Sequence, residues 1–271
     1  MPRACPACGN VDIAPLGRGT ERLEEQLAEL LADAMRPDGT PARIARMDAD
    51  STRQKGALEH QLAQVHAGEV DVLVGTQMVT KGHDFRRITL VAAVNPDSAL
   101  FSSDFRAPER LFSLLMQAAG RAGRDAAQAA ASEMWVQTFH PQHPLFAALK
   151  KNDFPAFAEQ QLKERQQAAM PPFAYQAVLR AEARTQEVAQ QFLQAAADAA
   201  PRLQGSDHVL VYAPVPMTVQ RVANVERAQL LLESGSRPAL QAFLADWQAQ
   251  LQAVRPRGLI RWAVDVDPLV I

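Results

Sequence analysis

Residues 70–85 of the sequence read VDVLVGTQMVTKGHDF, and this stretch decides the fold class. Its first five residues are apolar except for Asp71, a pattern typical of a short strand inside a sheet. The strand runs into Gly75, which favours a tight turn, and then into a loop of polar residues. In α/β proteins, ligands bind beyond the carboxyl ends of strands, so this loop is a candidate site. A polar loop that only connects two strands is the alternative.

Strand and helix patterns alternate on both sides of this stretch. Short strands are predicted at residues 43–47, 70–74, 88–94 and 134–139. Helices are predicted from an N-cap at Thr20 to about Met35, and at residues 53–66 and 107–119. The strand at 88–94 is nearly all apolar, as expected for a strand buried on both faces. This alternation predicts an α/β layer with a mostly parallel sheet.

The second half of the chain has a different order of elements. The run HPQHP at residues 140–144 marks a border. Beyond it, residues 145–168 are expected to be helical. Strands are predicted at 176–183, 209–212, 229–232 and 259–266, and helices at 187–200 and 237–254. The resulting β-α-β-β-α-β order is that of a split βαβ unit, which predicts a second, smaller α+β domain.

Bulk composition excludes few functions. The net charge of the 271 residues is −2, so any nucleic-acid contact must come from local clusters. No run approaches the ~18 apolar residues of a membrane helix, and the first ten residues lack the apolar centre of a signal peptide. We therefore expect a cytoplasmic chain with no membrane partner. The tryptophans Trp135, Trp247 and Trp262 are expected in the core.

A second informative segment, residues 117–124, reads QAAGRAGR. If helical turns continue through it, Gln117, Arg121 and Arg124 share one face. Gly120 and Gly123 remove side chains beside the arginines, so that a phosphate or another backbone can approach. An arginine on a γ-phosphate stabilises transition-state charge. The alternative is a helix end with glycine caps, where the arginines only compensate the helix dipole.

Together these two segments resemble motifs V and VI of superfamily 2 helicases. The stretch NPDSALFSSDFRAPER at residues 95–110 narrows the resemblance to the PriA family, the primosomal helicases that restart stalled bacterial replication forks. GRGTER at 17–22, YAPVP at 212–216 and WAVDVDP at 262–268 agree with it. The resemblance covers nearly the whole chain. It implies a RecA-like second helicase lobe at residues 16–144 and a PriA-type C-terminal domain at 145–271.

The resemblance also implies roles for single residues. Arg124 would be the arginine finger, Arg121 would assist at the γ-phosphate, and Gln117 would position the nucleotide or couple the lobes. The resemblance assigns the coupling of DNA to nucleotide to Gly75, Thr76, Gln77, Lys81, Gly82, His83, Asp84 and Asp97. The family usually has valine or a similar residue where Ala118 or Ala119 stands here, which is a mild departure.

The resemblance implies two cofactors, ATP with Mg²⁺ and structural Zn²⁺, and the chain carries only part of the site for each. The family hydrolyses ATP with Mg²⁺, yet the sequence has no G-x-x-x-x-G-K-[ST] and no Asp-Glu pair. We therefore expect the chain alone to lack ATPase and helicase activity. Cys5 and Cys8, in CPACG, resemble the last of the family's four CxxC pairs, so residues 1–15 would be the remnant of a structural zinc region. Two thiolates make half of a tetrahedral Zn²⁺ site, and two free thiols are the alternative.

Contacts with partners are expected in the second domain. Arg221 and Arg227, with Arg180 and Arg184 on an earlier strand, are candidates for contact with forked or single-stranded DNA, and scattered solvated arginines are the alternative. Arg237 and Gln241 lie one turn apart at the start of a predicted helix, a geometry suited to a peptide carboxylate. The resemblance implies single-stranded DNA-binding protein, whose acidic tail the family binds, and other primosome proteins as partners.

Three functions remain open at this point. The first is the motor fragment just described. The second is a non-catalytic DNA- or protein-binding module in which the C-terminal domain is the working part. The third is another kind of nucleotide hydrolase whose arginines act in trans, which the missing phosphate loop disfavours. Restoration of DNA-dependent ATP hydrolysis by an added first lobe would separate the first from the second.

Overall fold

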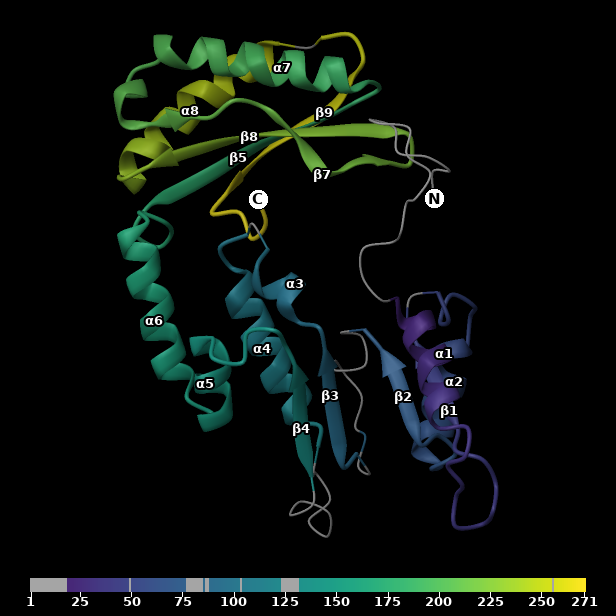
Figure 1. Ribbon diagram of the computed structural model, residues 1–271. Helices are drawn as coiled ribbons and strands as arrows, with labels where there is room; N and C mark the ends of the chain where they lie inside the picture. Colours follow the sequence, from purple (N-terminus) through teal and green to yellow (C-terminus); the bar gives the residue numbers. More distant parts are fainter. Residues whose placement is uncertain are drawn as a thin grey trace, which may run out of the picture. The chain divides into compact units, whose positions relative to one another are not determined.

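A computed structural model describes residues 19–48, 50–76, 85, 88–102, 104–122, 132–254 and 256–271. The chain forms two compact units, Met1–Asn152 and Asp153–Ile271 (Figure 1). The sequence placed the border after residue 144. Helix α5 (Pro144–Lys151), expected in the second domain, therefore belongs to the first unit.

The first unit is an α/β domain with parallel strand pairs. In chain order it contains α1 (Thr20–Leu30), β1 (Ile44–Met47), α2 (Ala57–His66), β2 (Val72–Gly75), β3 (Leu90–Val94), α3 (Asp97–Leu100), α4 (Ala107–Ala119), β4 (Glu133–Gln137) and α5. Strand β1 pairs with β2 and β3 pairs with β4, both in parallel (Figure 1). The expected alternation of strand and helix and the parallel pairing are confirmed. Among the described residues the four strands form two separate pairs.

Helix α4 shows why the bounds of a helix could be predicted from the sequence pattern. It begins at Ala107 with a proline in its first turn, where a missing N–H costs nothing. Leu111, Phe112 and Leu115 recur at helical spacing and are buried. The helix ends at Ala119, so its bounds agree with those predicted.

Four expectations for the first unit were wrong. Thr20 is the first helical residue and not the N-cap, which is Gly19 without a side-chain bond; the Thr20 hydroxyl instead donates to Asp48 at 2.5 Å. Helix α1 stops at Leu30, and that leucine is exposed. Strand β3 is not buried on both faces, because Leu90 and Val94 are exposed, and Trp135 on β4 is 61% exposed instead of lying in the core.

The second unit is a helix-covered antiparallel sheet. Its elements are α6 (Phe154–Gln167), β5 (Tyr175–Ala183), α7 (Gln186–Ala199), short 3₁₀ turns at 200–202 and 206–208, β6 (Leu210–Val211), β7 (Val215–Val222), β8 (Val225–Ser234), α8 (Arg237–Ala253) and β9 (Leu259–Val266). The strand order is β6-β8-β5-β9, with β7 also pairing with β8. Strand β8 lies between β5 and β6 and is antiparallel to both, which is the predicted split βαβ arrangement.

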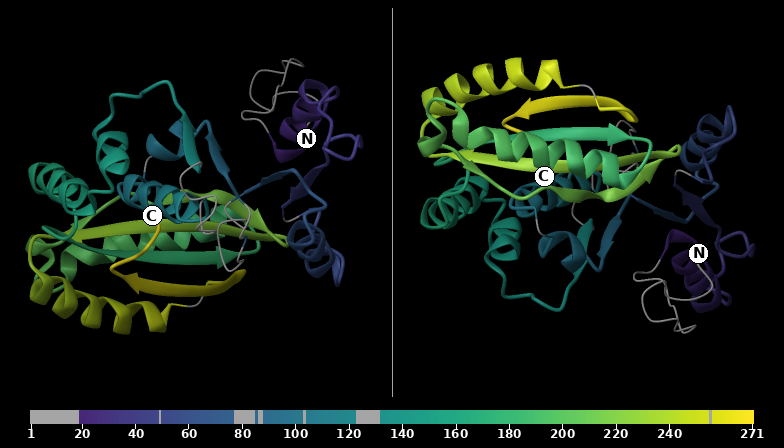
Figure 2. Two further views of the ribbon diagram at one scale, coloured as in Figure 1. Left: turned by 90° about the horizontal axis from the view of Figure 1, so that it is seen from below. Right: turned by 90° about the horizontal axis from the view of Figure 1, so that it is seen from above.

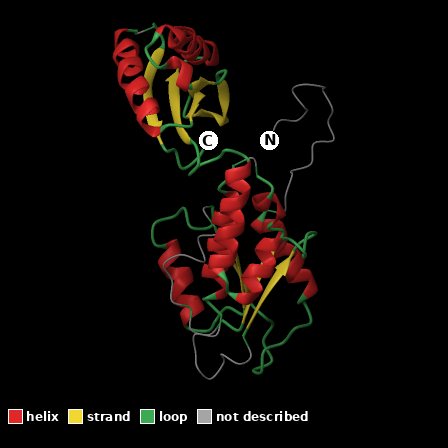
Figure 3. Ribbon diagram, turned by 90° about the vertical axis from the view of Figure 1, so that its left-hand side faces the viewer, coloured by secondary structure: helices red, strands yellow, loops and turns green. Residues whose placement is uncertain are grey.

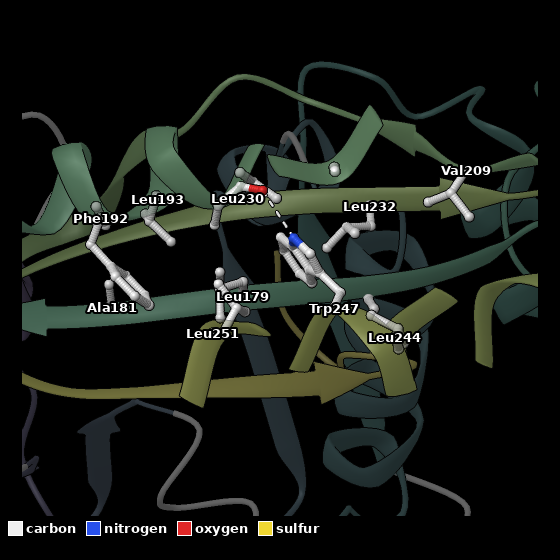
Figure 4. Close-up of a cluster of buried hydrophobic side chains, with 14 of the residues drawn as sticks. Leu179, Ala181, Phe192, Leu193, Val209, Leu230, Leu232, Leu244, Trp247 and Leu251 are labelled. Atoms are coloured by element: carbon white, nitrogen blue, oxygen red, sulfur yellow. Dashed lines mark hydrogen bonds between the residues drawn. The ribbon is translucent and has the colours of Figure 1, made fainter. Parts of the chain in front are cut away.

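Helices α7 and α8 cover one face of this sheet (Figures 2 and 3). The core between them is built from alternate residues of β5 and β8 and from the apolar faces of both helices. Trp247 on α8 is fully buried, and its indole N–H donates to the carbonyl of Ala196 on α7 at 2.9 Å (Figure 4). The polar tip of a buried tryptophan thus has a partner, as it must.

Two local features, one at the border of the units and one in the second unit, differ from the sequence prediction. The helix expected at 145–168 is interrupted, because Asn152 adopts a left-handed conformation and Asp153 caps α6 through the N–H of Ala156. Strand β7 was missed. It has an irregular register against β8 between Pro216 and Arg221 and is largely exposed, so it lacks the alternating burial by which strands are recognised.

No helix in the described part of the chain has both the length and the apolar character needed to span a bilayer.

Candidate nucleotide and nucleic-acid site

The polar loop that follows β2 begins at an exposed edge of the β1–β2 pair. Val74 is buried, whereas Gly75 and Thr76 are exposed. Gly75 is level with Met47 in the parallel register, so the segment that follows Met47 emerges at the same edge. The predicted partners Gln77, Lys81, Gly82, His83 and Asp84 lie outside the described residues. The structure therefore describes the part of this edge that Thr76 and the segment after β1 form.

The segment after β1 is organised by one carboxylate that the sequence prediction missed. Asp48 is 7% exposed and accepts hydrogen bonds from the Thr20 hydroxyl at 2.5 Å and from the backbone N–H groups of Ser51 and Asp50 at 2.8 and 3.0 Å. These bonds, led by that of Thr20, hold the pKa of the Asp48 carboxyl below its usual value. The Arg46 guanidinium, 3.5 Å away, acts in the same direction.

The turn held by Asp48 presents basic side chains to solvent. Arg53 and Lys55 are exposed in it, just before the N-terminus of α2. A sequence signal for this turn existed: the cluster DADST at residues 48–52 is rich in side chains that bond to nearby backbone. Cations and hydroxyls at one edge suit contact with phosphate oxygens.

Helix α4 presents the second predicted motif. Gln117 is exposed, on the side away from the buried residues Leu115 and Ala118. Arg121 follows the helix end in a continued turn, in which its N–H donates to the carbonyl of Ala118 at 3.0 Å. The structure therefore places Gln117 and Arg121 within a little more than one turn of each other. Arg124 lies outside the described residues.

Gly120 bears on the two interpretations of this motif. Its φ is −67°, in the right-handed region, where any residue is accommodated. A Cβ placed on it would meet only backbone oxygens at 3.5 and 3.7 Å, which is ordinary contact. The fold of this unit therefore does not require glycine at position 120. A left-handed glycine cap does not explain this residue, whereas close approach of a ligand would.

Asp97 has a structural part that the sequence prediction did not include. Its carboxylate, 8% exposed, accepts hydrogen bonds from the Thr138 hydroxyl and from the N–H of Phe139, the latter at 2.9 Å. These bonds lower the pKa of Asp97, the Thr138 bond most. Asp97 thus ties the segment after β3 to the segment after β4, and its oxygens are engaged inside the protein. The role of Asp97 in coupling DNA to nucleotide stays a prediction.

The metal expectation cannot be placed on this structure. Cys5 and Cys8 lie outside the described residues. Within the described ranges, no three His, Cys, Asp or Glu side chains are grouped so as to hold a metal ion.

In the second unit, Arg221 and Arg227 are each paired with an acid. Arg221 lies 3.4 Å from Glu226, and Arg227 lies 3.8 Å from Glu182. Glu182 also accepts two hydrogen bonds from Arg261, at 2.7 and 2.8 Å, and chiefly for that reason its pKa is lowered. The pairs reduce the positive charge that the two predicted arginines offer to DNA.

The same end of the sheet carries Arg184, which the sequence also suggested for this basic face, and Arg257, which the sequence prediction did not select. The N–H of Arg184 donates to the carbonyl of Gly258 at 2.9 Å, which brings Arg184 beside Arg257. Both residues are exposed. They are better placed than Arg221 and Arg227 to meet a phosphate, because neither lies within a short ion pair in the described structure.

The Arg237–Gln241 pair lies at the start of α8, as predicted. Ser236 caps the helix, and both side chains are exposed. The Arg237 guanidinium forms an ion pair with Asp267 and lies 5.7 Å from the centre of the Tyr175 ring. A carboxylate ligand at this place would therefore compete with Asp267.

Known protein families match parts of both units of the chain. Residues 18–126 match the helicase conserved C-terminal domain, and residues 166–269 match the C-terminal domain of primosomal protein N. The chain is 41% identical over 269 residues to the replication restart protein PriA of Haemophilus influenzae, covering 99% of this chain and 35% of that protein. It is 33% identical over 271 residues to PriA of Synechocystis, covering 100% of this chain and 31% of that protein.

The chain therefore spans about a third of the length of these relatives. The two domain matches lie in separate units of the structure, a parallel α/β unit and a split βαβ unit, as the sequence resemblance implied. The chain belongs to the PriA family of replication restart proteins, in which it corresponds to the second helicase lobe and the C-terminal domain.

Proposed function

We propose that this chain supplies the second motor lobe and C-terminal domain of an ATP-dependent 3′–5′ DNA helicase that recognises stalled or forked DNA and starts primosome assembly. The end of α4 and the turn after it carry the proposal: Gln117 is exposed, Gly120 has no side chain although a Cβ would fit there, and Arg121 follows directly. Arg121 and Arg124 would reach the γ-phosphate of a nucleotide held by the first lobe. Arginines in that role are worth about 10³ to 10⁵ in rate in other nucleotide hydrolases.

ATP and Mg²⁺ would be held mainly outside this chain. The 271 residues contain neither a phosphate loop nor an Asp-Glu metal motif. When bound, the nucleotide supplies the free energy of phosphoryl transfer, and Mg²⁺ neutralises charge on the β- and γ-oxygens. This chain would contribute Arg121, Arg124 and Gln117 to that site. Alone it would be inactive.

Complementation tests the proposal. We would measure ATP hydrolysis, with and without forked DNA, by the chain alone and after addition of the N-terminal half of a PriA relative. The mixture should hydrolyse ATP in a DNA-dependent manner. Arg124→Ala and Arg121→Ala should each remove that gain, whereas Arg202→Ala, an exposed arginine in the second unit, should retain it. Turnover by the pure chain that is lost in Arg124→Ala would contradict the proposal.

The β1–β2 edge would contact the DNA backbone. Thr76 and Gly75 would lie against phosphates together with Arg53 and Lys55, and Lys81 to Asp84 would line the cleft between lobes. This part of the proposal is supported by the shared edge of β1 and β2 and by the turn that Asp48 holds. Arg53→Ala should weaken DNA binding and reduce its salt dependence, because phosphate contacts release counterions.

Single-stranded DNA-binding protein and other primosome proteins would be partners of the whole protein. Arg237 and Gln241 remain our candidates for its acidic tail, with Asp267 as an internal competitor. Asp267→Asn should then tighten binding of an acidic C-terminal peptide, and Arg237→Ala should weaken it. A peptide that binds both variants as it binds the unchanged chain would exclude this dock.

We further propose that Cys5 and Cys8 supply half of a structural Zn²⁺ site, completed by cysteines elsewhere in the longer protein. A zinc titration of the chain with and without the missing half tests this. The whole protein would act in the cytoplasm, where bacterial DNA is replicated.

A non-catalytic binding module is the second candidate. It is favoured by the exposed Arg184 and Arg257 at one end of the second unit. Such a module would bind forked DNA through these arginines and would give no ATP hydrolysis in the complementation experiment. Binding that depends on Arg184 and Arg257 together with DNA-dependent ATPase in the mixture would support both functions in one chain.

A further inference from the structure

Two exposed phenylalanines lie just beyond the ends of the neighbouring strands β3 and β4. Phe101 follows α3 and is 58% exposed, and Phe139, two residues past β4, is 88% exposed. The N–H of Asn95 donates to the carbonyl of Gln137 at 3.2 Å, so the segments that follow the two strands are side by side. Both rings therefore belong to the carboxyl edge of this strand pair, the edge at which α/β domains bind ligands.

Phe101 is braced by histidine rings. Its ring centre lies 4.6 Å from that of His140 in an edge-on arrangement and 6.2 Å from that of His143. His143 in turn contacts Phe146, which is buried, and its Nδ1 accepts the N–H of Leu145 at the start of α5. This row of rings connects Phe101 to the core while more than half of the Phe101 side chain stays open to solvent.

The backbone beneath Phe139 is held as firmly. Asp97 binds the N–H of Phe139, and the Thr138 hydroxyl, itself bonded to Asp97, accepts the N–H of His140 at 3.0 Å. The negative charge of Asp97 is engaged by these donors, so it opposes an anionic ligand less than a free carboxylate would. The Phe139 ring, which extends from this fixed backbone and is 88% exposed, lacks the apolar stabilisation that burial would provide. Such a ring is typical of a binding surface.

We propose that Phe101 and Phe139 form a stacking platform for unpaired nucleobases of single-stranded DNA. We refer to Phe101, Phe139 and His140 as the aromatic edge. Nucleobases fit it because flat rings stack on aromatic side chains regardless of sequence. The proposal rests on the proposed function as a DNA motor lobe. It adds contacts with the DNA bases to the contacts with the DNA backbone that we expect at Thr76.

The test separates stacking from phosphate contact. Fluorescence anisotropy would compare binding of the 271-residue chain to labelled oligo-dT and to an abasic oligonucleotide of the same length. The unchanged chain should bind oligo-dT more tightly than the abasic strand. Phe101→Ala and Phe139→Ala should each weaken oligo-dT binding about tenfold and leave abasic binding unchanged. Phe154→Ala, which removes an exposed phenylalanine outside the aromatic edge, should leave both unchanged.

A second variant reports contact directly. Because Phe139 is so exposed, Phe139→Trp should fold normally, and its added fluorescence should be quenched by oligo-dT and not by the abasic strand. Equal binding of the two strands, unchanged binding by the alanine variants, or no binding at all would overturn the platform. If the aromatic edge instead packs against another protein, the alanine variants should bind DNA as the unchanged chain does. The ATPase complementation is independent, so the platform can fail while the motor proposal stands.

Discussion

The carboxylate of Asp97, just after β3, accepts a hydrogen bond from the backbone N–H of Phe139, just after β4, at 2.9 Å. The two residues are far apart in sequence, and this bond together with that of Thr138 fixes the carboxyl edge of the strand pair. A residue that the sequence resemblance assigns to nucleotide coupling thus also holds two loops together. It positions the backbone of the aromatic edge.

Removal of this carboxylate should destabilise the first unit. Asp97→Asn keeps the shape of the side chain but cannot accept both hydrogen bonds with the same strength. Hydrogen bonds to a buried charged group contribute about 1.5–3 kcal/mol, so we expect a loss of that order in the free energy of unfolding. Urea unfolding followed by circular dichroism measures it. An unchanged midpoint would show that the Asp97 bonds are not maintained in solution.

The pH dependence of stability should depend on Asp48. Its pKa is lower in the folded chain than in the unfolded chain, so its ionised form stabilises the fold above the unfolded pKa of about 3.9. That contribution is lost as the pH falls from about 5 through the folded pKa. Asp48→Asn should therefore reduce stability at pH 7 and flatten the decline below pH 5.

Asp50 supplies the matched control for this measurement. Its side chain is 83% exposed and lies two residues from Asp48 in the same turn. Asp50→Asn should leave the stability curve from pH 3 to pH 7 unchanged. If both variants show the same curve, the carboxylate of Asp48 is not the titrating group.

The two units should respond very differently to loss of a tryptophan. Trp247 is fully buried and bonded to the Ala196 carbonyl, so Trp247→Ala should cost about 3–5 kcal/mol in the second unit. Trp135 is 61% exposed, so Trp135→Ala should change stability by less than about 1 kcal/mol. Thermal unfolding of both variants tests this. A large loss in Trp135→Ala would indicate that β4 has a packing partner in solution.

Gly120→Ala separates a structural role from a functional one. Because a methyl group fits at this position and φ is right-handed, stability should change by less than about 0.5 kcal/mol. In the reconstituted motor, however, the methyl group should hinder the approach of nucleotide to Arg121 and lower kcat. Gly235→Ala, at another open position, should alter neither property. Full activity of Gly120→Ala would show that the approach of nucleotide does not require glycine at this position.

Neutralising Glu182 should strengthen DNA binding by the second unit. Glu182→Gln releases Arg227 and Arg261 from their shared carboxylate. Affinity for forked DNA should rise, and the slope of log K against log salt should steepen by up to about 0.9 for each phosphate gained. Glu159→Gln, which makes the same charge change beside Lys163 on α6, should have a smaller effect. Equal effects would point to net charge alone.

Periodicity alone was sufficient for the elements whose burial is decided locally. Helix α4 and strand β9 have the predicted bounds because their apolar residues face the core, where those of α4 are buried and those of β9 partly buried. Strand β7 and the break at Asn152 were missed. Strand β7 is paired with β8 and shows little burial. The break depends on a left-handed backbone conformation at Asn152, which several residue types can adopt.

For the site, spacing identified Gln117 and Arg121 as neighbours, because residues three and four apart share a helix face. Spacing could not reveal that Arg221 and Arg227 are paired with glutamates, since those partners come from other positions across the strands. Nor could it find Asp48, which acts through Thr20 on another element.

By itself, the sequence determined the fold class, the order of elements and the family, because these depend on local pattern and on contiguous motifs. Only the tertiary structure decided which charged groups are engaged and which are available. It made Asp97 a clamp, left Phe101 and Phe139 open at one edge, and showed that Gly120 is not required by the fold. The physical reason is that hydrogen bonding, ion pairing and burial depend on distances between residues remote in sequence, which no local pattern encodes.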